Sequence, residues 1–100
     1  MTVVVIGTVR FKPEDMAKLR PLIKALAEGT RKHDGCICYD VAEDMFDPGV
    51  VRYSELWPNE DLLKKHMSAP HVAQWMKDRA TFETLDRKFT VYDGSNERPL

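Results

Sequence analysis

Apolar residues near the start of the chain follow the two-residue period of a β-strand. Residues 3–11 are rich in β-branched side chains and stop at Lys12-Pro13, which predicts a strand over this range. A strand that is covered on one side alternates apolar with polar residues, whereas here both sides are apolar. We therefore expect this strand to be covered on both faces. One face carries Val3, Val5, Val9 and Phe11, and the other carries Val4 and Ile6.

The next segment has the three- and four-residue spacing of an amphipathic helix. Pro13 stands in the first turn and is followed by two acidic residues, which suit the positive end of the helix dipole. Pro21 lies inside the pattern and removes one backbone hydrogen bond, so we expect a kink there. Gly35 is expected to end the helix in a left-handed cap. The predicted buried stripe consists of Met16, Leu19, Leu22, Ile23, Leu26 and Thr30.

The remainder of the chain predicts a hairpin, two short helices and a last strand. Asp-Pro-Gly at 47–49 has turn chemistry and joins two strand-like runs. Asn59 suits the cap of one helix, and Pro70 suits the first turn of the next. The predicted strands cover residues 36–42, 50–57 and 84–92.

The predicted order β-α-β-β-α-β is that of the ferredoxin-like α+β fold. In this fold a four-stranded antiparallel sheet carries both helical segments on one face. The other face then needs a cover of its own, because buried apolar area contributes about 25 cal/mol per Å². A second copy of the sheet is the simplest cover. The sequence therefore predicts a homodimer, with one domain at residues 1–93 and a flexible tail at 94–100.

Composition and charge argue against several classes of function. The chain of 100 residues is 43% hydrophobic and 31% charged, with a net charge of −1. It lacks the basic stripe that nucleic-acid binding requires. No apolar run approaches the roughly 20 residues that span a bilayer, and the first residues lack the basic region and cleavage site of a signal peptide. We expect a cytoplasmic protein with no nucleic-acid and no membrane partner.

The residues that suit chemistry gather between positions 53 and 71. Glu55 and Trp57 are two apart and share one face of a predicted strand. His66 follows on the inner side of the next helix, and His71 stands at the start of the helix after it. The two histidines are five apart, which is not the i, i+4 spacing of a chelating pair, and no H-E-x-x-H motif occurs. We therefore expect no metal.

This pattern resembles the antibiotic-biosynthesis-monooxygenase family, including its quinol monooxygenases. The resemblance implies a dimeric α+β barrel with a pocket in each subunit between the sheet and its helices. Enzymes of this family oxygenate electron-rich phenols or quinols without flavin or metal, so no cofactor is implied. The likeness covers residues 3–92 and includes Glu55-Leu56-Trp57, His66, Pro70-His71, Gly35-Cys36-Ile37-Cys38-Tyr39 and Asp47-Pro48-Gly49.

The resemblance also implies roles for individual residues. The expected function is a cofactor-independent monooxygenase whose partners are dioxygen and a small aromatic or quinol-type substrate. Such a protein binds the substrate, stabilises its anion and excludes bulk water. His66 is the expected catalytic residue, because histidine titrates near neutrality. The expected substrate-binding residues are Trp57, His71, Trp75 and Glu55.

Each of these residues also has a purely structural interpretation. His66 could complete the core, and His71 could bond a neighbouring carbonyl. Glu55 is expected to pair with a basic side chain or a backbone N–H, since an unpaired buried carboxylate costs several kcal/mol. Two other functions stay open on the same scaffold. One is a non-catalytic small-molecule-binding or regulatory dimer, and the other is an isomerase or mutarotase.

Residues at three positions make haem degradation an unfavoured function for this chain. The haem-degrading members of the superfamily use an asparagine on the first strand, a tryptophan and an axial histidine near the second helix. The matching positions here hold Gly7 or Thr8, His66, and a residue close to Met76. All three differ, so haem chemistry would lack its usual setting.

Overall fold

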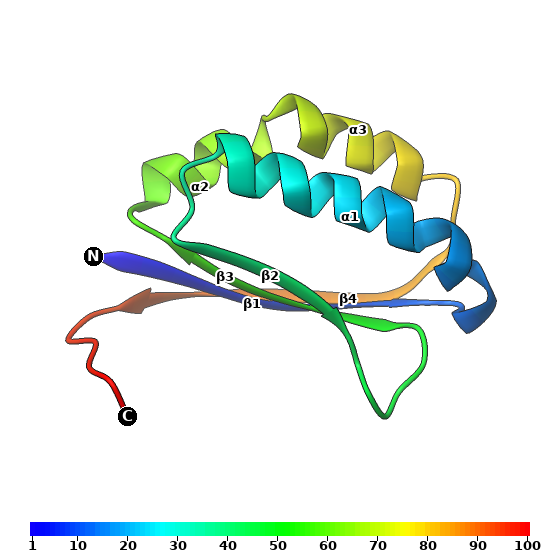
Figure 1. Cartoon of the computed structure of the whole chain (residues 1–100), viewed down its shortest axis with the longest axis horizontal. Coiled ribbons are helices and arrows are strands. Elements are labelled where there is room, and N and C mark those ends of the chain that lie inside the picture. Colours follow the sequence, from blue (N-terminus) through cyan, green and yellow to red (C-terminus); the bar gives the residue numbers. More distant parts are fainter.

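The computed structural model describes residues 1–100 and has the predicted order of elements. One antiparallel sheet has the strand order β2-β3-β1-β4, and the helices lie together on one face of it (Figure 1). This is the ferredoxin-like α+β fold, so the predicted fold class is confirmed. The elements are β1 (Thr2–Phe11), a 3-10 turn (Pro13–Asp15), α1 (Met16–His33), β2 (Cys38–Glu43), β3 (Val50–Trp57), α2 (Glu60–Met67), α3 (Pro70–Arg79) and β4 (Thr84–Gly94).

The central strand β1 has two distinct apolar faces, as its sequence predicts. Val5 lies opposite Glu55 of β3 and Val91 of β4, so these three side chains point to the same face, toward the helices. The apolar residues on this side of β1 are at most 4% exposed. They form the core together with α1 and β3. Its central members are Val3, Val5, Val9, Phe11, Leu19, Ile23, Leu26, Val51, Tyr53 and Trp57.

The opposite face of the sheet carries apolar side chains that no helix covers. Val4 lies opposite Leu56 of β3 and Tyr92 of β4. Ile6 follows two residues on, with 49% of its surface exposed. These four residues form an apolar strip across three strands, which we call the open-face strip. It is the surface on which the predicted second subunit would lie.

Helix α1 ends at the point where the chain turns back toward the sheet. The helix continues through Pro21 to His33, so the proline does not end it. The backbone N–H of Asp34 donates to the carbonyl of Thr30 at 3.1 Å. Gly35 then adopts a φ of +74°, which confirms the predicted left-handed cap. Asp34 is thereby held between a helix end and a reversal of the chain.

The hairpin and the start of α2 also use the predicted residues. Gly49 has a φ of +89°, and a side chain there would meet the carbonyl of Phe11. The side chain of Asn59 accepts a hydrogen bond from the N–H of Leu62 at 2.9 Å, which caps α2. Strand β2 begins at Cys38, two residues later than predicted.

Strand β4 lies at one edge of the sheet and is largely exposed. Leu85 and Val91 expose 47% and 53% of their surfaces. Phe89 is the residue of β4 that packs against the core. Its ring lies over Gly7 of β1, where any side chain would occupy the same space. None of the helices reaches the length and apolarity that a membrane-spanning helix needs.

Candidate functional site

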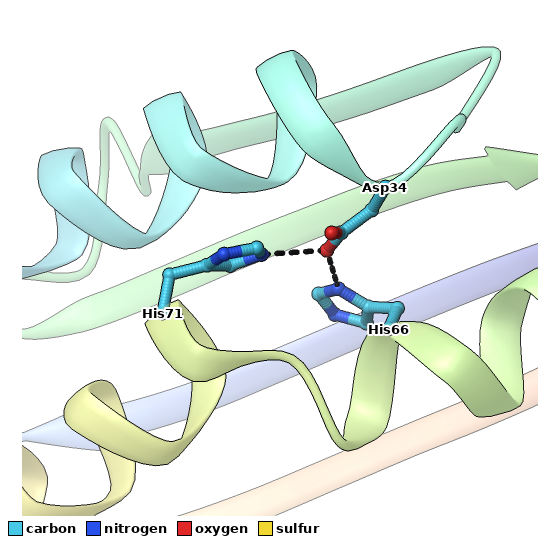
Figure 2. Close-up of side chains that lie close together, drawn as sticks. All are labelled: Asp34, His66 and His71. Carbon is cyan, nitrogen blue, oxygen red and sulfur yellow. Dashed lines mark hydrogen bonds and ion pairs between the residues drawn. The ribbon is translucent and has the colours of Figure 1, made fainter.

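Three side chains from the ends of three helices converge on one point (Figure 2). Asp34 caps the end of α1, His66 lies in the last turn of α2, and His71 lies in the first turn of α3. Oδ2 of Asp34 lies 2.6 Å from Nδ1 of His66 and 2.6 Å from Nε2 of His71. We call these residues the histidine–aspartate cluster.

The break between α2 and α3 brings the two histidines together. In one continuous helix, residues five apart point about 140° away from each other. Here a turn at residues 68–69 separates the helices and resets the helical phase. The ligand atoms of Asp34, His66 and His71 consequently lie within 4.8 Å of one another. The two rings share the Asp34 carboxylate although their five-residue spacing is not the i, i+4 spacing of a chelating pair.

The hydrogen-bond pattern assigns the protons of both rings. A carboxylate oxygen accepts, so His66 donates through Nδ1–H and His71 donates through Nε2–H. In a neutral imidazole the other nitrogen is an acceptor, which leaves Nε2 of His66 and Nδ1 of His71 with free lone pairs. No buried side-chain nitrogen or oxygen lacks a hydrogen-bond partner, so these two atoms reach accessible space. His66 is thus oriented as a proton acceptor.

The cluster lines a cleft of about 850 Å³. The side chains of His66 and Asp34 are 6% and 7% exposed, and that of His71 is 16% exposed. The cleft is within the size range that holds small molecules. His33 is exposed and stacks on His71, with ring centroids 6.3 Å apart. Other parts of the wall come from Gly29, Leu62, Lys65 and Ala69.

Behind His66, the site is supported by aromatic residues of the sheet. The His66 ring lies 4.9 Å from the ring of Trp57 and 5.6 Å from that of Tyr39. The indole Nε1–H of Trp57 donates to Oε1 of Glu55 at 3.0 Å. The expectation of a basic or backbone partner for Glu55 is therefore wrong, because an indole holds the carboxylate. Burial raises the pKa of Glu55, while the Trp57 hydrogen bond, and the charge of His66 when that ring is protonated, oppose the rise.

Trp75 lies in a separate and smaller cavity between the sheet and the helices. This cavity of about 60 Å³ is mostly apolar, and its aromatic members include Tyr39, Tyr53 and Phe89. We call it the aromatic cavity. The Tyr39 ring lies 5.6 Å from His66 and 6.3 Å from Tyr53, so it stands between the cluster and this cavity. Burial raises the pKa of Tyr53 to about 12 and also raises the pKa of Tyr39, so both phenols keep their protons at neutral pH.

The predicted site residues therefore occupy two places instead of one pocket. His66 and His71 line the cleft. Trp57 and Glu55 lie behind His66, at 0% and 5% exposure. Trp75 lines the aromatic cavity. The histidines meet the aromatic residues only through the rings of Tyr39 and Trp57.

Asp34 is the site residue that sequence analysis missed. Its partners stand 32 and 37 residues further along the chain, and no local pattern records a contact over that distance. Its one sequence signal is its position directly before Gly35. A glycine cap marks a helix end and a change of direction, so a carboxylate beside it can face another element.

Known proteins share both the sequence pattern and the fold. The antibiotic biosynthesis monooxygenase family model matches residues 2–78. A crystal structure of a candidate antibiotic biosynthesis monooxygenase from Deinococcus radiodurans is 32% identical, with a TM-score of 0.89 over 98% of this chain and 97% of that chain. A structure from Mycobacterium tuberculosis is 27% identical, with a TM-score of 0.85 over 99% of this chain and 100% of that chain.

A curated relative is longer than this chain. An uncharacterized protein of Synechocystis sp. is 27% identical over 90 residues, which cover 90% of this chain and 61% of the relative. The family match contains β1, the hairpin and all three members of the histidine–aspartate cluster. On the extent of that match, the chain belongs to the antibiotic biosynthesis monooxygenase family.

Proposed function

We propose that the protein is a monooxygenase that needs no cofactor and acts on a small aromatic or quinol-type substrate. The observation that carries this proposal is the shared carboxylate of Asp34, which binds Nδ1 of His66, a residue of the cleft wall, and leaves its Nε2 without a hydrogen-bond partner. A buried carboxylate behind an imidazole orients the ring and stabilises the imidazolium that forms when the ring takes a proton. Membership of a monooxygenase family supports the reaction class.

A quinol can carry out most of this reaction itself once it loses a proton. His66 takes the proton of a quinol hydroxyl at Nε2, and the resulting anion reduces dioxygen. One oxygen atom bonds to a ring carbon and the other leaves as water, so quinol and dioxygen give a hydroxyquinone and water. The substrate supplies all the electrons. General base catalysis of this kind contributes about 10²–10⁴-fold to the rate.

The neighbouring residues position the base and the substrate. His71 shares Asp34 and also lines the cleft, so a second hydroxyl group of the substrate can donate to its Nδ1. Trp57 packs on the His66 ring and is anchored by Glu55, which keeps the plane of the imidazole constant. Trp75 acts at a greater distance, because it packs the cavity on the far side of Tyr39.

We also propose that two chains form a homodimer through the open-face strip. Ile6 and Tyr92 expose 49% and 56% of their surfaces on that side of the sheet, and burial of several hundred Å² drives association at about 25 cal/mol per Å². Ile6→Asp should convert a dimer into a monomer in light scattering, because the charge would lie in the apolar interface. Met45→Asp is the control, since Met45 lies in the hairpin loop at 89% exposure. A wild-type monomer at micromolar concentration would contradict the dimer.

Oxygen uptake with menadiol tests the reaction. The quinol is prepared without air and added to an oxygen electrode, and the wild type should consume oxygen faster than buffer. With ¹⁸O₂, mass spectrometry should find one labelled oxygen in the product. Uptake equal to buffer by both the wild type and His66→Ala would remove this substrate class. Quinol binding without uptake would instead favour a non-catalytic binding protein.

A further inference from the structure

We propose that the histidine–aspartate cluster binds one divalent transition-metal ion per chain, with Zn²⁺ and Co²⁺ as representative ions. The ligands are Nδ1 of His66, Nε2 of His71 and a carboxylate oxygen of Asp34. This goes beyond the proposed oxygenase reaction, which requires no metal, and it can be measured in the absence of any substrate.

The two ring nitrogens already point at the same Asp34 oxygen (Figure 2). Both nitrogens lie 2.6 Å from the same oxygen, and all three atoms lie within 4.8 Å of one another. Around a tetrahedral zinc ion with bonds of about 2.1 Å, neighbouring ligand atoms lie about 3.4 Å apart. A small rotation of the Asp34 side chain, which lengthens both N–O distances, therefore makes room for the ion.

The chemistry of the ligands suits zinc and its neighbours in the first transition row. Imidazole nitrogens bind zinc, copper, iron and nickel, and a carboxylate oxygen is a common companion ligand. Three protein ligands leave at least one coordination position open, as in zinc sites that exchange their fourth ligand. The cleft of about 850 Å³ lies along all three residues, so an ion and a water molecule can enter from solvent.

The surroundings hold the ligands in this arrangement before an ion arrives. The backbone N–H of Asp34 is bonded to the end of α1, and the His66 ring is supported by Trp57 and Tyr39. The partners of the Asp34 carboxylate are the two imidazoles, with no lysine or arginine among them. Ligands that are ordered in advance lose less freedom on binding. The remaining charged residue of the cleft wall, Lys65, is exposed.

A bound ion and the proposed base exclude each other. In the metal-free protein the proton of His66 lies on Nδ1 and the lone pair on Nε2. Coordination through Nδ1 uses that nitrogen's lone pair, so the proton moves to Nε2 and no net proton is released. His66 then cannot accept a proton from a substrate. Metal binding should therefore reduce any oxygenase activity that depends on this base.

Calorimetric titration of the metal-free, tag-free full chain with Zn²⁺ tests the site. We expect one ion per chain with a dissociation constant in the micromolar range or tighter. His71→Ala and Asp34→Asn should each weaken binding roughly 100-fold or more, since removal of a ligand costs at least as much as removal of its support. With Co²⁺, the wild type should show the visible absorption of a low-coordinate site, and both variants should lose it.

Two controls address other sources of binding. His33→Ala removes the neighbouring exposed histidine, and a Cys36→Ser/Cys38→Ser variant removes both free thiols. Both variants should bind Zn²⁺ as the wild type does. Zn²⁺ should also raise the melting temperature of the wild type and of these controls, but not that of Asp34→Asn. Millimolar binding by the wild type, or equal binding by wild type and Asp34→Asn, would overturn the proposal.

The metal site and the oxygenase reaction can fail separately. If Zn²⁺ binding depends on all three ligands but the wild type consumes no oxygen, the result supports the metal site and counts against the proposed reaction. If the wild type consumes oxygen but binds no metal, the result supports the proposed reaction and overturns the metal site. Tight binding that leaves uptake unchanged supports the metal site and shows that the base lies elsewhere.

Discussion

The histidine cleft and the aromatic cavity lie on either side of the Tyr39 ring, yet their walls differ in kind. The cleft holds about 850 Å³ and has a buried carboxylate with two imidazoles. The aromatic cavity holds about 60 Å³ and is closed mainly by apolar and aromatic side chains. Its phenols are protonated at neutral pH, and burial raises their pKa further above the ordinary value of 10. The cleft can therefore accept and donate protons, whereas the side chains of the aromatic cavity mainly pack against one another.

The difference follows from where each region lies along the secondary structure. The aromatic cavity lies over the middle of the sheet, where strand residues alternate and apolar side chains face the helices. The cleft lies where α1 ends and where α2 gives way to α3. At helix ends, side chains from distant parts of the chain can contact one another outside the packed core. Ligands and protons also reach these ends from solvent.

The largest effect should come from His66→Gln. Glutamine has a similar size and can donate to Asp34, but it cannot take a proton from the substrate. Oxygen uptake should fall roughly 100-fold or more in kcat/KM, with the fold unchanged by circular dichroism. Lys64→Ala, an exposed change on the same helix, should leave uptake as it is. If Trp75→Phe caused the same loss as His66→Gln, the two regions would not differ in function.

A smaller effect, on stability, should come from Trp57→Phe. The change removes the only side-chain donor to the buried Glu55 carboxylate, and an unsatisfied buried group costs about 1–3 kcal/mol. Urea unfolding should show this loss. Trp75→Phe is the matched control, because it removes packing without removing a hydrogen-bond donor from Glu55. Equal losses in both variants would show that the Glu55–Trp57 bond contributes nothing of its own.

Gly7→Ala should disturb the aromatic cavity and leave the cleft unchanged. The added methyl group meets the ring of Phe89, and overpacking of this kind costs about 1–3 kcal/mol. Oxygen uptake per folded molecule should stay within about twofold of the wild type, because His66 does not line that cavity. A loss of uptake as large as that of His66→Gln would place the substrate in the aromatic cavity.

The smallest expected effect is the pH dependence that Glu55 adds to stability. Burial raises its pKa above the ordinary value of 4.5, so the folded state binds this proton more tightly than the unfolded state. The contribution of Glu55 to the free energy of unfolding is therefore fully present below pH 4.5 and falls as pH rises toward the raised pKa. The carboxylates of Glu43, Asp44 and Asp47 have lowered pKa values. Their contribution to the free energy of unfolding therefore increases as the pH rises. The measurement is the free energy of unfolding in urea, compared between the wild type and Glu55→Gln from pH 4 upward. Glu60→Gln, at an exposed position, is the control. The same pH dependence in the wild type and Glu55→Gln would contradict the effect of the buried Glu55 charge.

The fold could be predicted from the sequence because its determinants are local. The two apolar faces of β1 are visible in a run of nine residues, and Gly35, Gly49 and Asn59 each mark an element end that the structure confirms. Periodicity and turn chemistry depend on neighbouring residues. The order of elements then leaves few ways to pair four strands.

The site could be predicted only in part, because its geometry depends on contacts across the chain. Both histidines and the break between their helices were predicted, whereas Asp34 and its contact with both rings were not. The phase of α3 relative to α2 depends on the turn at residues 68–69, and the sequence predicts this turn without giving the angle between the two helices. The indole partner of Glu55 was missed for a different reason, since the sequence gives no rule that prefers a neighbouring tryptophan over an arginine.

The tautomers of the two histidines test the shared carboxylate most directly. Long-range ¹H–¹⁵N correlation spectra of the metal-free protein, at a pH where both rings are neutral, report which nitrogen carries the proton. We predict a proton on Nδ1 of His66 and on Nε2 of His71, and Asp34→Asn should abolish this fixed pattern. A proton on Nε2 of His66 in the wild type, or rapid exchange between tautomers in both rings, would contradict the account.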